Sequence, residues 1–331
     1  MKFFIIYFIL GTDMSDKILE TIKPGDFGYN VVSKHNDLIR AYCDLNVTEY
    51  KLLLGCISKI NSFDKLTSET PVVFSLEEAG EVFDFDYKNS GIVKIFRDAA
   101  NELMTKIVRN EDSNGFNDTT IAQQAIYDRR AKTMTIYFSR GIIPYVSGLR
   151  RNLTTYRILH IGKMTSKYAI RLYELLIMWL KKDYEHKKVK ELEIEELKKL
   201  LAIKGNYDTS ITMFKKTVIE PAFKQINELT DIHLEVKFTK TEKKITHIEL
   251  TFSYKDEWIK YESELRENKK LTKDQIRKII NNKEFYDKYF NGWLRENRDK
   301  DVGVLDWMKE VEGQLKENAY AYYPEYSKYL N

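Results

Sequence analysis

The sequence has few of the residues from which metal sites, disulfide frameworks and metal-dependent nucleases are built. Its 331 residues include only 2 cysteines, 5 histidines and 5 prolines. Cys43 and Cys56 fit no disulfide framework or metal-ligand spacing, so we expect reduced thiols packed near a helix, with an oxidised pair as the alternative. The histidines never form the His-x-His pair with which single-strand nicking nucleases bind their metal. The sequence therefore predicts no metal site.

Signatures of nucleotide binding and of nucleophilic catalysis are also missing. Gly162-Lys163 lacks the preceding glycine-rich loop that cradles a phosphate, and no Gly-x-Ser-x-Gly elbow occurs. The acidic pairs Glu77-Glu78 and Glu195-Glu196 lie where helices are predicted to begin, and the helix dipole alone accounts for acids there. We therefore expect a protein that is not an enzyme and needs no cofactor.

The charge and apolar content are those of a globular protein that is not a polycation. The chain is 43% hydrophobic and 31% charged, and its formal net charge is +4. Any affinity for nucleic acid would have to come from local clusters of Lys and Arg. The length fits about two domains of ordinary size.

An unbroken apolar run at residues 3–10 follows Lys2. It is shorter than the about 20 residues that span a bilayer, and no small-x-small cleavage site follows it. We expect either a misassigned start, with Met14 as the first residue, or a disordered tail; export or membrane anchoring is the alternative. No other segment approaches transmembrane length. We therefore expect a cytoplasmic protein with no membrane partner.

Two stretches of the chain repeat each other at an offset of 118 residues. Ser75-Leu76-Glu77-Glu78-Ala79 is echoed by Glu193-Ile194-Glu195-Glu196-Leu197. Each half then ends in two runs of alternating apolar residues, and the order helix, short strand, helix, helix, hairpin is that of a winged helix-turn-helix. The same offset, without gaps, relates apolar positions in neighbouring elements: Tyr50 and Tyr168, Leu52 and Ile170, Leu54 and Leu172, Val82 and Leu200, and Phe96 and Phe214.

In the first half, capping signals mark where the helices begin. Asn46 with Glu49, and Ser75 with Glu78, have the spacing of capping boxes. Short strands are predicted at 31–33 and 71–74. A loop over 110–120 precedes a hairpin of residues 121–127 and 133–138 with a basic tip, which is the wing. A longer helix is predicted over 91–108 with an inward stripe at Ile92, Ile95, Phe96, Ala99, Leu103 and Ile107.

The second half repeats this order with a more basic hairpin. Helices are predicted over 166–179 and 194–201, with a strand at 188–192 between them. Asp208-Thr209-Ser210 caps a further helix towards Glu228, and Pro221 inside it should kink or restart that helix. Strands at 234–238 and 245–252 flank a lysine-rich tip at 239–244. Four apolar residues of the first of these helices fall on one face and are predicted core: Tyr168, Leu172, Tyr173 and Leu176.

Past Tyr254 the sequence is helix-prone, aromatic and highly charged. Thr272 and Gln275 form a capping box, and an aromatic stripe runs over 285–293. We predict an α+β protein of two tandem winged-helix domains with a helical C-terminal extension. The predicted boundaries are a tail at 1–30, a first domain at 31–150, a second domain at 151–255 and a partly disordered extension at 256–331.

The candidate DNA contacts are polar and basic residues on the third helix and the hairpin of each half, with an arginine pair at the junction. Base reading needs hydrogen-bond donors on an exposed helix face, with cations beside them for phosphates. Singly, each residue is better explained as part of a solvated face, but their recurrence at equivalent places in two copies favours DNA. The arginine pair either touches the DNA backbone or pairs with acids across the domain interface. The candidates are Lys88, Asn89, Ser90, Lys94, Arg97, Arg129, Arg130, Lys132, Arg150, Arg151, Lys204, Asn206, Thr209, Ser210, Thr212, Lys215, Lys216, Lys237, Lys240, Lys243 and Lys244.

Four segments, in this order, carry a family resemblance. They are VSKHNDLI at 32–39, LNVTEYKLL at 45–53, SKYAIRLYELL at 166–176, and the stretch at 214–230 with the hairpin after it. Together they resemble the replication initiator proteins of iteron-containing, theta-replicating plasmids. The resemblance covers about residues 31–254 and leaves the N-terminal run and the C-terminal extension outside it.

The resemblance implies two winged-helix domains that bind repeated origin sequences in double-stranded DNA as a monomer and help to melt the origin. It also implies a homodimer that forms through the first domain and represses the gene at an operator inverted repeat, and host helicase-loading proteins as partners. The second domain would be the main reader, with residues 210–216 in a major groove. A tandem winged-helix transcription regulator is one alternative; a rolling-circle nicking enzyme is another, disfavoured by the missing His-x-His pair.

Overall fold

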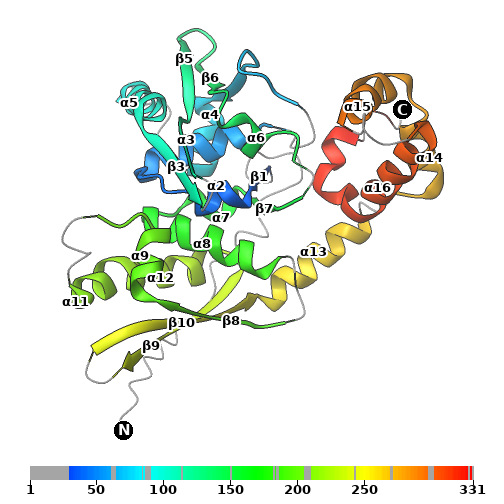
Figure 1. Cartoon of the computed structure of the whole chain (residues 1–331). Helices are drawn as coiled ribbons and strands as arrows, with labels where there is room; N and C mark the ends of the chain where they lie inside the picture. Colours follow the sequence, from blue (N-terminus) through cyan, green and yellow to red (C-terminus); the bar gives the residue numbers. More distant parts are fainter. Residues whose placement is uncertain are drawn as a thin grey trace. The chain divides into compact units, whose positions relative to one another are not determined.

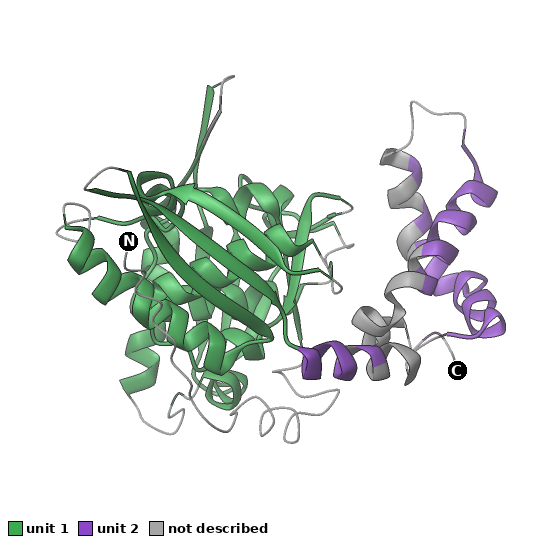
Figure 2. Cartoon of the chain, turned by 90° about the horizontal axis from the view of Figure 1, so that it is seen from below, with its two compact units in different colours: residues 1–255 green, residues 256–331 purple. Residues whose placement is uncertain are grey.

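The computed structural model describes residues 30–326 and Tyr329, apart from positions 61–64, 84, 86–90, 113–114, 150, 182, 184–185, 205–209, 242–243, 269–270 and 297–301. The predicted N-terminal tail lies almost wholly outside these residues. The chain divides into unit 1, residues 1–255, and unit 2, residues 256–331 (Figure 2). Among the helices described, none is long and apolar enough to cross a membrane.

The first half of unit 1 has the predicted order of a winged helix-turn-helix (Figure 1). Its wing is an antiparallel sheet with strand order β2-β6-β5, and β3 and β4 form a separate hairpin. The elements are β1 (Val31–His35), α2 (Asn36–Arg40), α3 (Val47–Ile57), β2 (Val72–Ser75), α4 (Leu76–Phe83), α5 (Gly91–Thr105), β3 (Ile107–Asp112), β4 (Gly115–Thr120), β5 (Ala122–Asp128), β6 (Thr133–Phe138) and α6 (Ile143–Val146).

Local hydrogen bonds explain where α3 and α4 begin. The Asn46 side chain accepts from Glu49 N at 3.0 Å, and Glu49 Oε2 accepts from Asn46 N at 2.9 Å. Ser75 and Glu78 make the same reciprocal pair at 2.9 and 3.1 Å. Each box satisfies backbone donors that have no partner within the helix. Both predicted capping boxes are confirmed.

The helix α5 is shorter than predicted, and its buried stripe is narrower. It ends at Thr105, and Ile107 instead begins β3, where it pairs with Thr120 of β4. The predicted loop at 110–120 is therefore wrong, because most of it belongs to this hairpin. Ile95 was predicted to face inward but is 46% exposed, since it lies at the rim of the stripe. The spacing of apolar residues in a helix does not show where the helix ends when a strand follows it directly.

The second half of unit 1 follows the same order as the first. Its wing is the antiparallel sheet β8-β10-β9. The elements are β7 (Leu153–Arg157), α7 (Leu159–Gly162), α8 (Lys167–Leu180), β8 (Lys188–Glu193), α9 (Ile194–Leu200), α11 (Ile211–Met213), the π-helix η2 (Phe214–Ile219), α12 (Glu220–Leu229), β9 (Ile232–Thr241) and β10 (Lys244–Tyr254).

The predicted boundary at 150–151 is crossed by a strand pair and by a helix contact. β1 pairs antiparallel with β7, from Val31 with Arg157 to His35 with Leu153. The helix α7 packs on α4 so closely that a Cβ on Gly162 would lie 2.3 Å from a backbone oxygen of α4. The two halves thus share backbone contacts, and the boundary between them stays a prediction.

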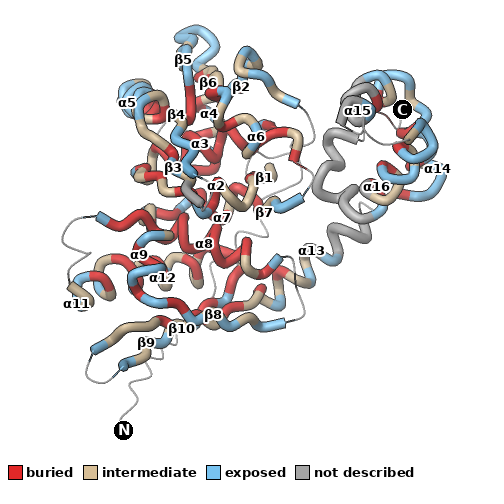
Figure 3. The backbone as a smooth tube through the Cα atoms, viewed as in Figure 1, coloured by how far each residue is buried: buried red, intermediate tan, exposed pale blue. Residues whose placement is uncertain are grey.

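The helix α8 is the centre of unit 1, and nearly all of its residues are buried (Figure 3). Its predicted core residues are confirmed, since none is more than 8% exposed: Tyr168, Leu172, Tyr173 and Leu176. Burial extends around the helix rather than along one face, because elements of both halves pack on it. The elements that pack on α8 are α2, α3 and β7, which precede it in the sequence, and η2 and α12, which follow it.

A buried ion pair links α8 to the first half. Glu174 Oε1 lies 2.6 Å from Lys34 Nζ, and the two side chains are 2% and 4% exposed. The same oxygen accepts a hydrogen bond from Tyr156 Oη at 2.5 Å. A buried charge is tolerated only when it is paired and hydrogen-bonded. Lys34 of β1 and Tyr156 of β7 therefore hold the strand pair against α8.

The two cysteines are free, buried thiols, as expected from the sequence. Burial raises the pKa of Cys43 to about 11 and that of Cys56 to about 12. Both thiols are therefore neutral near pH 7, and a neutral thiol is a poor nucleophile and metal ligand.

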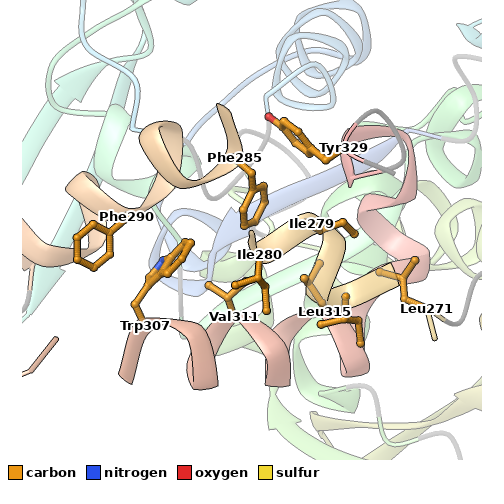
Figure 4. Packing of buried hydrophobic residues seen from close by; sticks show 10 residues of the cluster. Leu271, Ile279, Ile280, Phe285, Phe290, Trp307, Val311, Leu315 and Tyr329 are labelled. Carbon is orange, nitrogen blue, oxygen red and sulfur yellow. The ribbon is translucent and has the colours of Figure 1, made fainter. Parts of the chain in front are cut away.

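The described part of unit 2 consists of helices around a core of its own (Figure 4). The helices are α13 (Asp256–Asn268), α14 (Lys273–Ile280), α15 (Lys283–Glu296) and α16 (Val304–Tyr326). The predicted capping box of Thr272 and Gln275 is present at α14. The side chains of Tyr289 and Trp293, part of the predicted aromatic stripe, lie outside the described residues. The core residues are Leu271, Ile276, Ile279, Ile280, Phe285, Phe290, Trp307, Val311, Leu315 and Tyr329.

We expect Trp307→Ala to unfold unit 2. Trp307 is 1% exposed and touches the rings of Phe285 and Phe290, and truncation of a buried Trp costs about 3–5 kcal/mol. Limited proteolysis should degrade residues 256–331 of the variant at protease concentrations that leave the wild type intact, while residues 30–255 persist. Leu305→Ala, at a position 73% exposed, is the control. Equal resistance of the Trp307 variant and the wild type would contradict this packing.

Candidate nucleic-acid interface

The recognition helix of the second half begins at a side-chain cap. Ser210 Oγ accepts a hydrogen bond from Met213 N at 3.3 Å, as the capping signal predicts. Thr212 and Lys216 are exposed and lie four residues apart, so they share one face of the helix. Asn206 and Thr209 fall outside the described residues. This face offers a hydroxyl and a cation where a ligand can approach.

Pro221 changes the course of this helix in a way that the sequence shows only in part. Residues Phe214–Ile219 form a π-helix, and Glu220 N donates to Lys215 O, five residues back. A proline has no N–H, so the carbonyl four residues before it loses its helical partner. The wider π turn accommodates this loss, and α12 restarts with Pro221 in its first turn. The turn sets the direction of the recognition helix relative to α12.

Lys215 and Lys216 are neighbours in the sequence but have different surroundings. Lys215 Nζ lies 3.9 Å from the centroid of the Phe238 ring on β9. Burial lowers the pKa of Lys215, and the nearby charge of Lys240 lowers it further. Lys216 is exposed. Lys215 therefore fastens the recognition helix to the wing, and Lys216 is available to a ligand.

The second wing presents cations along its outer half. Lys237, Lys240 and Lys244 are exposed, and Lys243 lies outside the described residues. Lys237 Nζ is 3.6 Å from Glu249 Oε1, so an acid on the next strand partly offsets its charge. The register between β9 and β10 shifts between Ile245 and His247. Such a bulge increases the twist of the hairpin towards its tip.

Asn227 joins α12 to the wing, through a contact that was not predicted from the sequence. Its Nδ2 donates to Leu234 O at 3.0 Å, and its Oδ1 accepts from Leu234 N at 2.9 Å. Its own carbonyl accepts from Lys255 Nζ at 2.6 Å. The side-chain amide thus pairs with β9 like a strand residue. An Asn close to the end of a helix is a weak signal in sequence, because it also fits a cap.

The first half also presents exposed cations, and an acid lies among those of α5. Lys94 and Arg97 are exposed on α5, but exposed Asp98 follows them directly. At the wing tip, Asp128 Oδ1 accepts from the backbone N–H groups of Arg130 and Ala131 at 2.7 and 3.0 Å. This turn leaves the three predicted side chains exposed: Arg129, Arg130 and Lys132. Lys88, Asn89 and Ser90 lie outside the described residues.

Residues at the junction of the halves differ in exposure and partners. Arg151 is exposed, and Arg150 lies outside the described residues. Lys204 Nζ lies 3.5 Å from Asp44 Oδ2 and 5.3 Å from the centroid of the Tyr42 ring. Lys204 therefore points towards a segment of the first half. In the part of the chain that the structure describes, no group of three or more His, Cys, Asp or Glu is placed to hold a metal ion.

In Figure 1, α5 and α11 lie on the same side of unit 1, and the wings β5–β6 and β9–β10 lie at its opposite ends. A ligand that reached both recognition helices would therefore have to be elongated. Each helix presents exposed cations, and each wing adds more. This is the arrangement of a tandem winged-helix DNA reader.

Comparison with known proteins gives the family. The family model described as "Initiator Replication protein, WH1" matches residues 31–177, and "Initiator Rep protein, WH2" matches residues 193–252. The chain belongs to the plasmid replication initiator family. A replication initiation protein of Escherichia coli is 27% identical over 274 residues, which are 80% of this chain and 82% of that protein.

The fold is that of a solved initiator. A crystal structure of the Pi initiator protein in complex with iteron DNA superimposes with a TM-score of 0.58 at 16% identity. It covers 69% of this chain and 99% of that chain. The two predicted winged-helix domains are thus confirmed as the WH1 and WH2 folds. Residues 256–331 lie beyond both family models.

Proposed function

We propose that the protein initiates plasmid replication by binding direct repeats, or iterons, in the origin. The observation that carries the proposal is the pair of recognition helices on one side of unit 1, each with exposed cations (Figure 1). The Pi initiator, which has the same fold, was solved in complex with iteron DNA. Binding of this kind depends on phosphate contacts for affinity and on base contacts for specificity. Origin binding would place the protein with the plasmid in the cytoplasm.

The second half is proposed as the main reader. Its recognition helix is capped by Ser210 and presents Thr212 and Lys216. Its wing adds Lys240 and Lys244 close to the tip. A hydroxyl can hydrogen-bond base edges in the major groove, while lysines neutralise phosphates. On α5, by contrast, Asp98 adds repulsion beside its two cations, so we assign weaker DNA binding to the first half.

We also propose that the first half forms the homodimer, through the outer face of its wing sheet. Val73, Thr135 and Ile126 lie in one row across β2, β6 and β5 in the strand register. Val73 and Ile126 are each 46% exposed, and this row carries no charge. β5 is the edge strand of the sheet and offers unpaired backbone groups to a second copy. A dimer of this kind would bind the inverted repeat of the gene's own operator.

The remaining steps of initiation follow from DNA binding. Binding to several iterons would help to melt the origin, and host helicase-loading proteins would act on the complex. We infer that the protein acts by binding and does not cut DNA. A tyrosine covalently joined to DNA after incubation with supercoiled origin DNA and magnesium would contradict that inference.

Lys216→Ala and Lys215→Ala should weaken DNA binding in different ways. Each lost phosphate contact lowers the slope of log K against log salt by about 0.9. We expect this change for Lys216→Ala, because its side chain is exposed, whereas Lys215→Ala should lower affinity with little change in slope, because Lys215 packs on Phe238. Fluorescence anisotropy with a duplex taken from the DNA beside the gene measures both quantities.

The control is Lys224→Ala, at a position 64% exposed on α12. Its slope and affinity should equal those of the wild type. An unchanged slope for Lys216→Ala would rule out a phosphate contact at that residue. An equal drop in slope for both neighbouring lysines would show that the packing of Lys215 does not matter.

Ile126→Glu should dissociate the homodimer. A charge on the proposed interface would stay unpaired on association, and a loss of about 1.4 kcal/mol raises the dissociation constant about tenfold. Sedimentation velocity over a range of concentrations should show the variant as a monomer where the wild type dimerises. Val189→Glu, at a position 63% exposed on β8, should dimerise like the wild type. The proposed face is wrong if Ile126→Glu dimerises like the wild type as well.

A further inference from the structure

The turn that leads from α9 towards the recognition helix lies against the first half of unit 1. It contacts a short segment of the first half, Ala41 to Leu45, which follows α2 and precedes α3. Three side chains make these contacts: Arg171, Asp44 and Lys204. We use their arrangement to infer how the second half is positioned on DNA, and this inference rests on the DNA binding proposed above.

Arg171 bonds to both sides of this contact. From α8 its guanidinium donates to Leu200 O, the last residue of α9, with Nε at 2.9 Å and Nη2 at 2.5 Å. Nη2 also donates to Ala41 O at 3.1 Å, and Nη1 donates to Tyr50 Oη at 2.9 Å. Arg171 is 5% exposed. A guanidinium presents its donors in a rigid fork, so these bonds fix the end of α9 relative to the first half.

The turn itself has a conformation that needs such support. Ala202 has a φ of 53°, in the left-handed region. Ile203 N donates to Lys198 O and Ala202 N to Lys199 O, both at 3.0 Å, as in a helix end that usually carries glycine at this position. An alanine there is strained. Arg171 takes the Leu200 carbonyl that α9 leaves without a helical partner.

Asp44 and Lys204 form the second contact, just after the turn. Asp44 Oδ1 accepts from Lys167 Nζ at 2.7 Å, and its Oδ2 lies 3.5 Å from Lys204 Nζ. Asp44 thus bridges the first residue of α8 and the residue that follows the turn. Tyr42, whose ring lies under Lys204, exchanges two backbone hydrogen bonds of 2.9 Å with Arg109 of β3. The segment is therefore anchored in the first half.

We propose that Arg171, Asp44 and Lys204 are positioning residues that set the recognition helix of the second half through the first half. Lys204 then serves DNA binding through Asp44 and Tyr42 and not as a phosphate contact, the role that the sequence suggested for it. The affinity of the second half for DNA depends on residues that do not touch DNA. One of them, Asp44, carries the charge that DNA repels.

Asp44→Asn separates the two roles of Lys204. If Lys204 bound a phosphate, removal of the neighbouring negative charge would strengthen DNA binding. If Asp44 positions the turn, the same change weakens binding, by about two- to fivefold for a partly exposed ion pair. Lys204→Ala should weaken binding in the same direction, and the double variant no further than Asp44→Asn alone, because Asp44→Asn already removes the contact with Lys204. Arg171→Lys, which keeps the charge but loses the fork, should weaken binding at least about tenfold.

The experiment compares full-length variants by anisotropy on a duplex from the DNA beside the gene and on a scrambled duplex of the same length. Asp183→Asn is the control: Asp183 is also paired with two basic side chains, Lys188 and His186, but it follows the end of α8. It should leave affinity unchanged or slightly higher. The melting temperature of each variant shows that the fold is intact.

Hydrogen exchange of the full chain without DNA gives a second, independent result. Amides at 201–204 and 210–216 should exchange up to about fivefold faster in Asp44→Asn and Lys204→Ala, and not in Asp183→Asn. Tighter or unchanged DNA binding by Asp44→Asn, or unchanged exchange in these amides, would overturn the proposal. If the wild type bound both duplexes equally, the proposed iteron binding would fail, and the exchange result alone would decide the positioning role.

Discussion

Charges buried on α8 hold the two winged-helix folds in one unit. The pair of Glu174 and Lys34 lies 2.6 Å apart and out of water, and Arg171 donates from the same helix to Tyr50 and Ala41. To break a buried pair by removing one partner costs about 3–5 kcal/mol, because the remaining charge stays buried and unpaired. Movement of the first half away from α8 would break these contacts together. Lys34, Tyr50 and Ala41 belong to the first half, whereas Arg171 also donates to Leu200 of the second half, so α8 belongs structurally to both halves.

The sharing of α8 by both halves has a consequence for how the two winged-helix copies would bind DNA. Two winged-helix copies on a flexible linker would bind DNA as separate modules, whereas copies that share α8 present their recognition helices at a fixed separation. The copies also differ: residues 210–216 of the second carry no acid, whereas Asp98 lies beside the cations of α5, and the first has an uncharged row on its outer sheet face. On the proposed function, the shared helix would let a strong reader and a weaker DNA-binding domain act on one stretch of DNA.

Much of the fold could be predicted from local sequence signals. The capping boxes at Asn46 and Ser75, the alternating hairpins and the repeat itself gave the order of elements, because these signals are complete within a few residues. The β3–β4 hairpin was missed because residues 110–120 are nearly all polar and lack the alternation of apolar residues that predicts strands. The π-helix was missed because Pro221 predicts that the helix is interrupted but does not predict which backbone conformation replaces the α-helix before it.

The sequence predicted which types of residue could contact DNA, but not how those residues are arranged in the folded protein. Lys215 and Lys216 look alike in sequence, and only the position of Phe238 on a later strand separates them. Lys204 looks like a phosphate ligand until Asp44, far away in the chain, is seen beside it. Such pairings are set by tertiary contacts, for which a single sequence carries no local signal.

If unit 1 reads DNA with two recognition helices held at a fixed separation, each bound protein should protect two patches of the DNA beside its gene. Hydroxyl-radical footprinting measures this protection. We expect the two patches on one face of the duplex, about one helical turn or 10 base pairs apart. A single patch, or two patches whose spacing varies from one repeat to the next, would contradict the fixed separation.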